Sequence, residues 1–156
     1  EEIAALAAAR GLPIARRSAG ALPHAGTAVY LADTLGEMGT LYAALPVTFL
    51  AGSLVPVGGH NPIEPAHAGT ALLLGPLMPN NRDAAEALVA AGGARQITDA
   101  ATLAAAVGAL LDDPAAARAQ AAAAGRVAAD GREGLERILR ALAPLLPEPA
   151  QRERAP

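Results

Sequence analysis

The chain has 156 residues, of which 53% are hydrophobic, 17% charged and 2% aromatic; this is the size of one domain and excludes a disordered segment. It contains no cysteine, which excludes disulfides, thiolate metal sites and a cysteine nucleophile. The formal net charge is −3 and the basic residues form no cluster beyond the pair Arg16-Arg17, so we expect no nucleic-acid partner.

Short apolar strands alternate with helices along the chain, beginning with a helix at 2–10 that Gly11 ends. Strands are predicted at 12–16, 27–32, 47–52, 70–75 and 94–98. Helices are predicted at 33–45, 62–69, 82–93, from a cap at Thr98 or Asp99 to Leu111, at 114–124 behind Asp113-Pro114, and at 132–142. A disordered tail is expected at 147–156.

This order of elements predicts an α/β domain over 1–146, with a Rossmann-like parallel sheet covered by helices on both faces. The three closing helices have no strand between them, so we expect them to pack outside the sheet. The uncharged stretch 41–59 is long enough to span a bilayer, but its prolines and glycines favour a buried strand and a loop. Because the chain opens inside a helix, we expect a fragment that lacks the first strand of its domain.

Three polar segments directly follow predicted strands, at the edge where open parallel sheets bind their ligands. They are ADTLGEM, AGSLVPVGGHNPIEP and GPLMPNNRD. Helix capping alone explains part of each segment, because an oxygen-bearing side chain precedes an acid by three residues. The matching residues are Thr34 with Glu37, Asn61 with Pro62 and Glu64, and, more weakly, Asn80 with Asp83.

The second segment holds more than a helix cap needs. Glycines in such density let a backbone approach a ligand closely. We therefore take Ser53, Gly58, Gly59 and His60 as candidates to line a cleft. A glutamate at a helix start can accept hydrogen bonds from sugar hydroxyls, and neither GxGxxG nor a Walker A sequence occurs. A nucleotide that carries a sugar and few phosphates is the ligand that this pattern favours.

Other chemistry finds little support in the sequence. The three histidines, at 24, 60 and 67, are too sparse for a zinc site, so we predict neither a metal nor a cofactor. Ser53 and His60 lie near each other in the sequence, but the Gly-x-Ser-x-Gly elbow of a hydrolase is missing.

The stretch VYLADTLGEMGTLY, followed by FLAGSLVPVGGHNPIEPAHAGTALLLGP, resembles the C-terminal half of the 3-deoxy-D-manno-octulosonic acid (Kdo) transferases. The ordered pair of motifs DTxGE and GSLVxxGGHNPxEP is specific in combination, and the resemblance extends over residues 2–146. It implies the C-terminal, donor-binding half of a two-domain GT-B glycosyltransferase that moves Kdo from CMP-Kdo to a lipid A precursor. Such enzymes work in lipopolysaccharide synthesis at the cytoplasmic face of the bacterial inner membrane.

The resemblance also implies which residues bind and which functions lie elsewhere. The catalytic base, the membrane-anchoring segment and most acceptor contacts belong to the family's N-terminal domain, so we expect no catalytic residue and no transfer activity in this chain alone. The residues that correspond to the family's CMP contacts are Gly36, Glu37, Met38, Asn61, Pro62, Ile63 and Glu64. In this hypothesis Glu64 bonds the ribose hydroxyls, and amides at the two helix starts face the leaving phosphate.

Two departures and two alternatives accompany the resemblance. The family's Gly-Gly-Ser is Ala-Gly-Ser at 51–53, and its Asn-Phe-x-Asp is Asn-Asn-Arg-Asp at 80–83. Neither departure changes a proposed CMP contact. The alternatives are a GT-B transferase or epimerase that uses a UDP-sugar, and a non-catalytic α/β interaction module whose capped helices are only structural.

Overall fold

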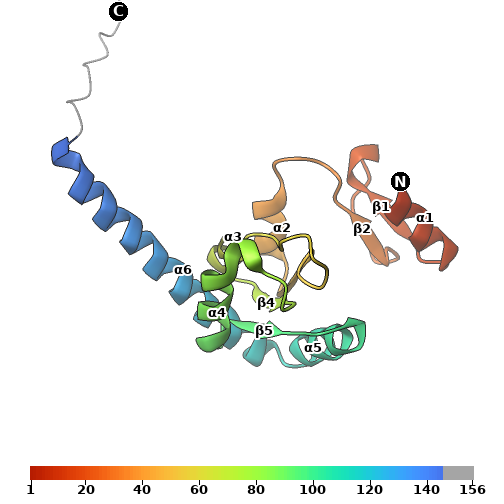
Figure 1. The fold of residues 1–156 in the computed structure, drawn as a ribbon. Helices are drawn as coiled ribbons and strands as arrows, with labels where there is room; N and C mark the ends of the chain where they lie inside the picture. The colour runs from red at the N-terminus through yellow and green to blue at the C-terminus, as the bar shows by residue number, and fades with distance from the viewer. Residues whose placement is uncertain (146–156) are drawn as a thin grey trace, which may run out of the picture. The chain divides into compact units, whose positions relative to one another are not determined.

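The computed structural model describes residues 1–145, and the tail predicted at 147–156 lies outside them. The chain divides into two compact units, Glu1–Met38 and Gly39–Pro156. Figure 1 labels the α-helices of both and, β3 excepted, the strands. All five predicted strands form and all are parallel, but they belong to two sheets, one in each unit.

The first unit is a helix followed by a pair of short parallel strands. It contains α1 (Glu2–Ala9), β1 (Ile14–Arg16), the 3-10 helix η1 (Arg17–Ala19) and β2 (Val29–Leu31). Ile14 pairs with Val29 and Arg16 with Leu31. Because β1 and β2 are parallel, η1 and the loop after β2 both follow carboxyl ends of strands, at one edge of this sheet.

The second unit is built on a three-stranded parallel sheet in the order β3-β4-β5. The strands are β3 (Val47–Leu50), β4 (Ala71–Leu74) and β5 (Ala94–Gln96). Every residue of β4 is buried, as expected for a central strand with helices on both faces. Leu72 and Leu74 pack on one face with α3 (Ile63–Ala68), α4 (Arg82–Ala90) and α6 (Pro114–Leu142). Ala71 and Leu73 pack on the other with α5 (Ala100–Asp112).

The predictions for the closing helices were wrong in two respects. The segments 114–124 and 132–142 form one continuous helix, α6, although Gly125 and Gly131 interrupt the alanine-rich pattern. This helix also covers the sheet instead of lying outside it, since Ala124 and Ala128 are buried in the core with β4. Small side chains allow the close packing: a Cβ atom at Gly93 would lie 2.6 Å from the Ala124 backbone.

Two predicted helix starts are confirmed by their hydrogen bonds. Asp99 accepts the Thr102 amide at 2.7 Å and closes a capping box at the start of α5. Asp113 accepts the amides of Ala115 and Ala116 at 3.0 Å at the start of α6. Both caps fix the ends of helices that cover the sheet.

Within the described residues, no single helix is long and apolar enough to cross a membrane. The pair Ala100–Asp112 and Pro114–Gly131 meets the length and composition together, with a bend of 106° between its helices.

Candidate functional site

The loop after β2 carries the first predicted site segment, Gly36 to Met38, in the first unit. The predicted capping box at its start was wrong: α2 (Met38–Ala44) begins four residues after Thr34. Gly36 has a φ of +84°, a left-handed conformation that glycine adopts without strain, and both Leu35 and Gly36 are exposed. The segment is therefore an irregular loop that presents its backbone to solvent.

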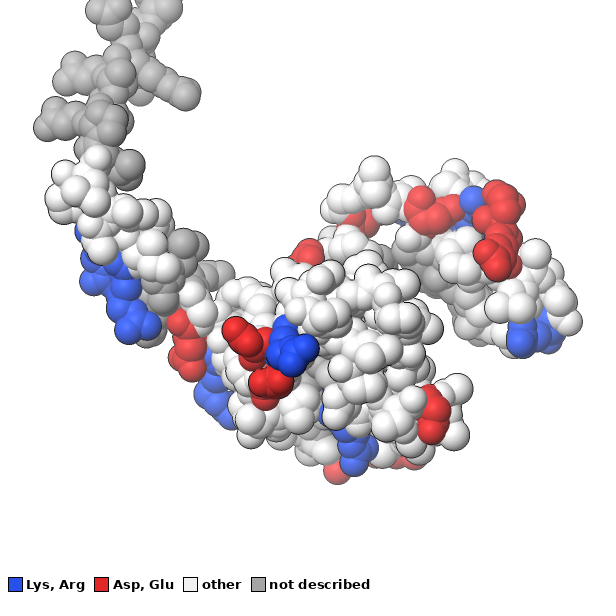
Figure 2. All heavy atoms as spheres, viewed as in Figure 1, with Lys and Arg blue, Asp and Glu red and all other residues white. Residues whose placement is uncertain are grey.

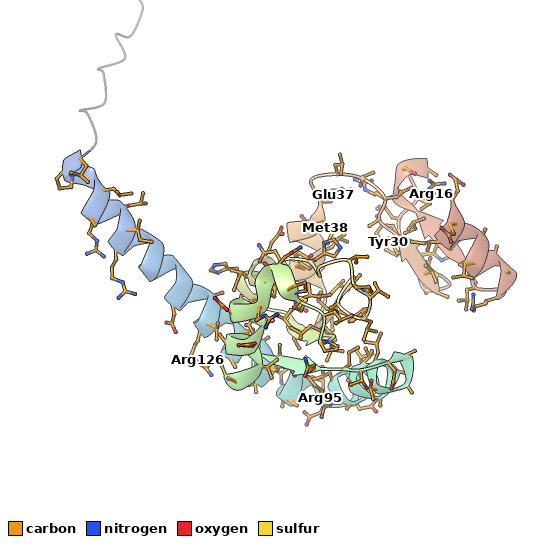
Figure 3. All side chains as sticks on the ribbon, in the orientation of Figure 1. Arg16, Tyr30, Glu37, Met38, Arg95 and Arg126 are labelled. Carbon is orange, nitrogen blue, oxygen red and sulfur yellow. The ribbon has the colours of Figure 1, made fainter. Side chains whose placement is uncertain are left out.

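Glu37 is held by a partner distant in sequence instead of capping a helix. The Arg17 guanidinium donates to both carboxylate oxygens, from Nη2 at 2.8 Å and from Nε at 3.0 and 3.1 Å, and the Thr34 hydroxyl donates as well. The hydrogen bonds from Arg17, and to a lesser extent that from Thr34, lower the pKa of Glu37 to about 2. Glu37 is thus an ionised, half-buried group already engaged within its own unit. Figure 3 labels it on the loop that leads to α2.

Asp33 makes a second such contact at the same edge. Arg16 Nε donates to its carboxylate at 2.5 Å, and the backbone amide and hydroxyl of Ser18 donate at 2.9 and 2.7 Å. The hydrogen bond from Arg16, followed by those from Ser18, holds the pKa of Asp33 well below its usual range. Arg16 also bonds Glu1 at 2.6 Å. No local sequence pattern indicates these bonds, because Arg16 lies 17 positions from Asp33 and Arg17 lies 20 from Glu37.

In the second unit, the loop after β3 is fixed by a buried serine. The Ser53 side chain is 0% exposed; its hydroxyl donates to the Leu50 carbonyl at 2.5 Å and accepts the Gly75 amide at 2.7 Å. The Leu77 amide donates to the Ser53 carbonyl at 2.9 Å. Ser53, a candidate to line the cleft, therefore joins the loops that follow β3 and β4, and its hydroxyl is satisfied within the protein.

Gly58 and Gly59 lie against this second loop. Both have positive φ, +105° and +67°, and a Cβ atom on either would overlap a neighbour, Asn80 for Gly58 and Met78 for Gly59. The glycine density that the sequence suggested as a place for a ligand thus also has a structural reason. It lets residues 58–59 pass close to residues 78–80.

The segment Asn61 to Glu64 leads into α3, which begins at Ile63. The Asn61 side chain accepts the Ile63 amide at 3.0 Å, as a capping residue does, and Gly69 ends the helix in the left-handed conformation. The rest of the predicted box is missing, because Glu64 does not reach back to the backbone of Asn61. Likewise, no side chain caps α4, where Asn80 and Asp83 had suggested a box.

Glu64 is consequently a carboxylate without a bonding partner among the described residues. It is exposed, whereas Pro62 beside it is fully buried and fixes the backbone of the turn. Burial raises the pKa of the Tyr42 phenol, and the negative charge of Glu64 adds to the rise, which places Tyr42 near this carboxylate. His60 is exposed on the same segment. The Glu64 carboxylate is thus a free hydrogen-bond acceptor beside a turn that the buried Pro62 fixes.

The third predicted segment, GPLMPNNRD, lines a groove of about 540 Å³ at the carboxyl end of β4. It lies between the loop 75–79 and α4, and its polar side chains are Arg82, Glu86 and Gln96. The position of this segment directly after a strand indicated the edge of the sheet, but no contact residue was predicted in it. None of the predicted contact residues lines it.

On the face that Figure 2 shows, acidic and basic side chains are interspersed over the described residues, and no broad basic patch appears. Among the side chains that the structure describes, no three of His, Asp or Glu gather in a way that could hold a metal ion.

Comparisons with known proteins bear on this arrangement. No family model matches the chain. It is 44% identical over 125 residues to the 3-deoxy-D-manno-octulosonic acid transferase of Bordetella pertussis, an alignment that covers 80% of this chain and 29% of that protein. The transferase of Haemophilus influenzae is 34% identical over 132 residues, covering 84% and 31%. The chain thus spans about a third of the length of these relatives.

A solved structure extends the likeness to three dimensions. The C-terminal CMP-Kdo binding domain of WaaA from Acinetobacter baumannii matches with a TM-score of 0.77 and 33% identity, over 81% of this chain and 66% of that one. The fold is accordingly that of one half of a GT-B glycosyltransferase. Within that class, the chain is a homologue of the 3-deoxy-D-manno-octulosonic acid transferases, and it corresponds in fold to the C-terminal domain of WaaA.

Proposed function

We propose that this chain is the donor-binding part of a Kdo transferase and that it binds the CMP portion of CMP-Kdo. The observation that carries the proposal is its likeness to a C-terminal CMP-Kdo binding domain, over 81% of the chain. Homology to named Kdo transferases supports the same donor. The sugar acceptor and the chemistry are assigned to the rest of the whole protein.

The proposed CMP contacts are Gly36, Glu37 and Met38 in the first unit and Asn61, Pro62, Ile63 and Glu64 in the second. Glu64 has the strongest support from its surroundings, because its carboxylate is exposed and unbonded within the described residues. A carboxylate in this state can accept two hydroxyl donors, and adjacent ribose hydroxyls are such a pair. Gly36 supports the proposal differently, by exposing its backbone in a loop without regular structure.

We further propose that residues 1–146 form this binding domain and that its first strand lies outside the chain. The likeness to a C-terminal CMP-Kdo binding domain supports this, since it extends over 81% of this chain but only 66% of that one. In the whole protein, the remaining domain would supply the catalytic base, the contacts to a lipid A precursor and attachment to the cytoplasmic face of the inner membrane. The chain alone would then bind the donor nucleotide without transferring the sugar.

Calorimetric titration with CMP and with UDP tests the donor class. We expect saturable binding of CMP and an affinity for UDP at least about tenfold weaker, a difference of about 1.4 kcal/mol. Tighter binding of UDP would instead identify a transferase or epimerase that uses a UDP-sugar. Binding of neither nucleotide would favour a non-catalytic interaction module.

A further inference from the structure

Consecutive side chains at the end of β1 hold both carboxylates of the loop after β2. Arg16 and Ser18 bond Asp33, where the loop begins, and Arg17 bonds Glu37, where it ends. The loop between the two acids has no regular secondary structure. Its conformation therefore depends on contacts made by residues some distance away in the sequence.

The contact between Arg17 and Glu37 constrains the loop most strongly. Three hydrogen bonds of 2.8–3.1 Å join the planar guanidinium to both carboxylate oxygens, a fork that fixes orientation as well as distance. Both side chains are 37% exposed, so the pair is only partly screened by solvent. Because the two residues are 20 positions apart, the bonds join η1 directly to the residue that precedes α2.

We propose that Arg17 is a positioning residue for donor binding: it holds Glu37 and so fixes the loop that presents Gly36 and Met38 to the CMP portion of the donor. The inference rests on the proposed function and goes beyond it by assigning a role to a residue outside the predicted contacts. The guanidinium donates to Glu37 through both Nε and Nη2, and it therefore acts through that carboxylate.

A double-mutant cycle in the full chain tests the role. We expect Arg17→Ala and Glu37→Ala each to weaken CMP binding by roughly tenfold, and the double variant to bind no more weakly than either single one. Arg17→Lys keeps the charge but cannot form the fork, so it should restore part of the affinity. Arg10→Ala is the matched control, because Arg10 bonds only a carbonyl of its own helix; its CMP affinity should equal that of the parent.

Melting curves on the same variants separate loss of binding from loss of folding, and Arg17→Lys serves as the test if Arg17→Ala does not fold. Unchanged CMP affinity in both Arg17 variants would overturn the inference alone. Losses that add in the double variant would also overturn it, since they would show that Arg17 contacts the nucleotide directly. A parent chain that binds no CMP would instead refute the proposed function, and this inference with it.

Discussion

Glu64→Ala is expected to weaken CMP binding by about 10- to 100-fold while leaving the fold intact. A hydrogen bond to a charged group contributes about 1.5–3 kcal/mol, which corresponds to that range of affinity. Loss of CMP affinity should occur without loss of stability, because Glu64 is exposed and bonds no other described residue. We therefore expect the free energy of unfolding to change by no more than about 0.5 kcal/mol. Calorimetry with CMP and a denaturant titration measure the two quantities.

Glu86→Ala provides the matched control for this variant. Glu86 is also an exposed glutamate on a helix of the second unit, but it lies in the middle of α4 and lines the groove beside it. Its replacement should leave CMP affinity unchanged. If Glu86→Ala weakens binding and Glu64→Ala does not, the nucleotide occupies the groove and the assignment of the site is wrong.

Gly75→Ala is expected to destabilise the second unit and to weaken CMP binding together. Gly75 is buried, and a Cβ atom there would lie 2.6 Å from the Ser53 carbonyl carbon and overlap the carbonyl oxygen. Because the obstacle is backbone, the loop after β3 has to shift. Overpacking of this kind costs about 1–3 kcal/mol. The shift would also displace the segment that leads to Glu64, which lowers CMP affinity.

Gly108→Ala tests whether the effect comes from the overlap. Gly108 lies inside α5, and a Cβ atom there meets nothing within 4 Å. This replacement should stabilise the protein by about 0.4–1 kcal/mol through the lower entropy of the unfolded chain. Denaturant titrations of both variants make the comparison. Equal stability of Gly75→Ala and the parent would contradict the packing described for these loops.

Local sequence patterns predicted the strands and several helix ends correctly because short-range interactions determine them. Asp99 and Asp113 each bond amides two or three residues away, and Gly69 ends α3 by its own backbone conformation. The start of α2 could not be predicted in this way. Glu37 bonds Arg17, 20 positions earlier, in place of the local box, and that competition depends on how the strands pair.

Tertiary packing supports the continuity of α6 as far as Ala128. Glycine inside a helix costs about 1 kcal/mol relative to alanine, so Gly125 and Gly131 suggested a break. Burial of Ala124 and Ala128 against β4 favours the helix across Gly125, whereas the described residues after Ala128 are exposed. The predicted site also combines local and long-range effects. The hydrogen bond of Asn61 to the Ile63 amide is local and forms as predicted, whereas the need for glycine at 58 and 59 comes from the close approach of residues 78–80.

The most direct test of the donor site is titration of the nitrogen-15-labelled chain with CMP, followed by NMR of the backbone amides. The proposed site predicts saturable shifts at Ile63 and Glu64, with much smaller changes at Arg82 and Gln96 in the groove. Saturable shifts confined to the groove residues, or no saturable shift at any amide, would contradict it.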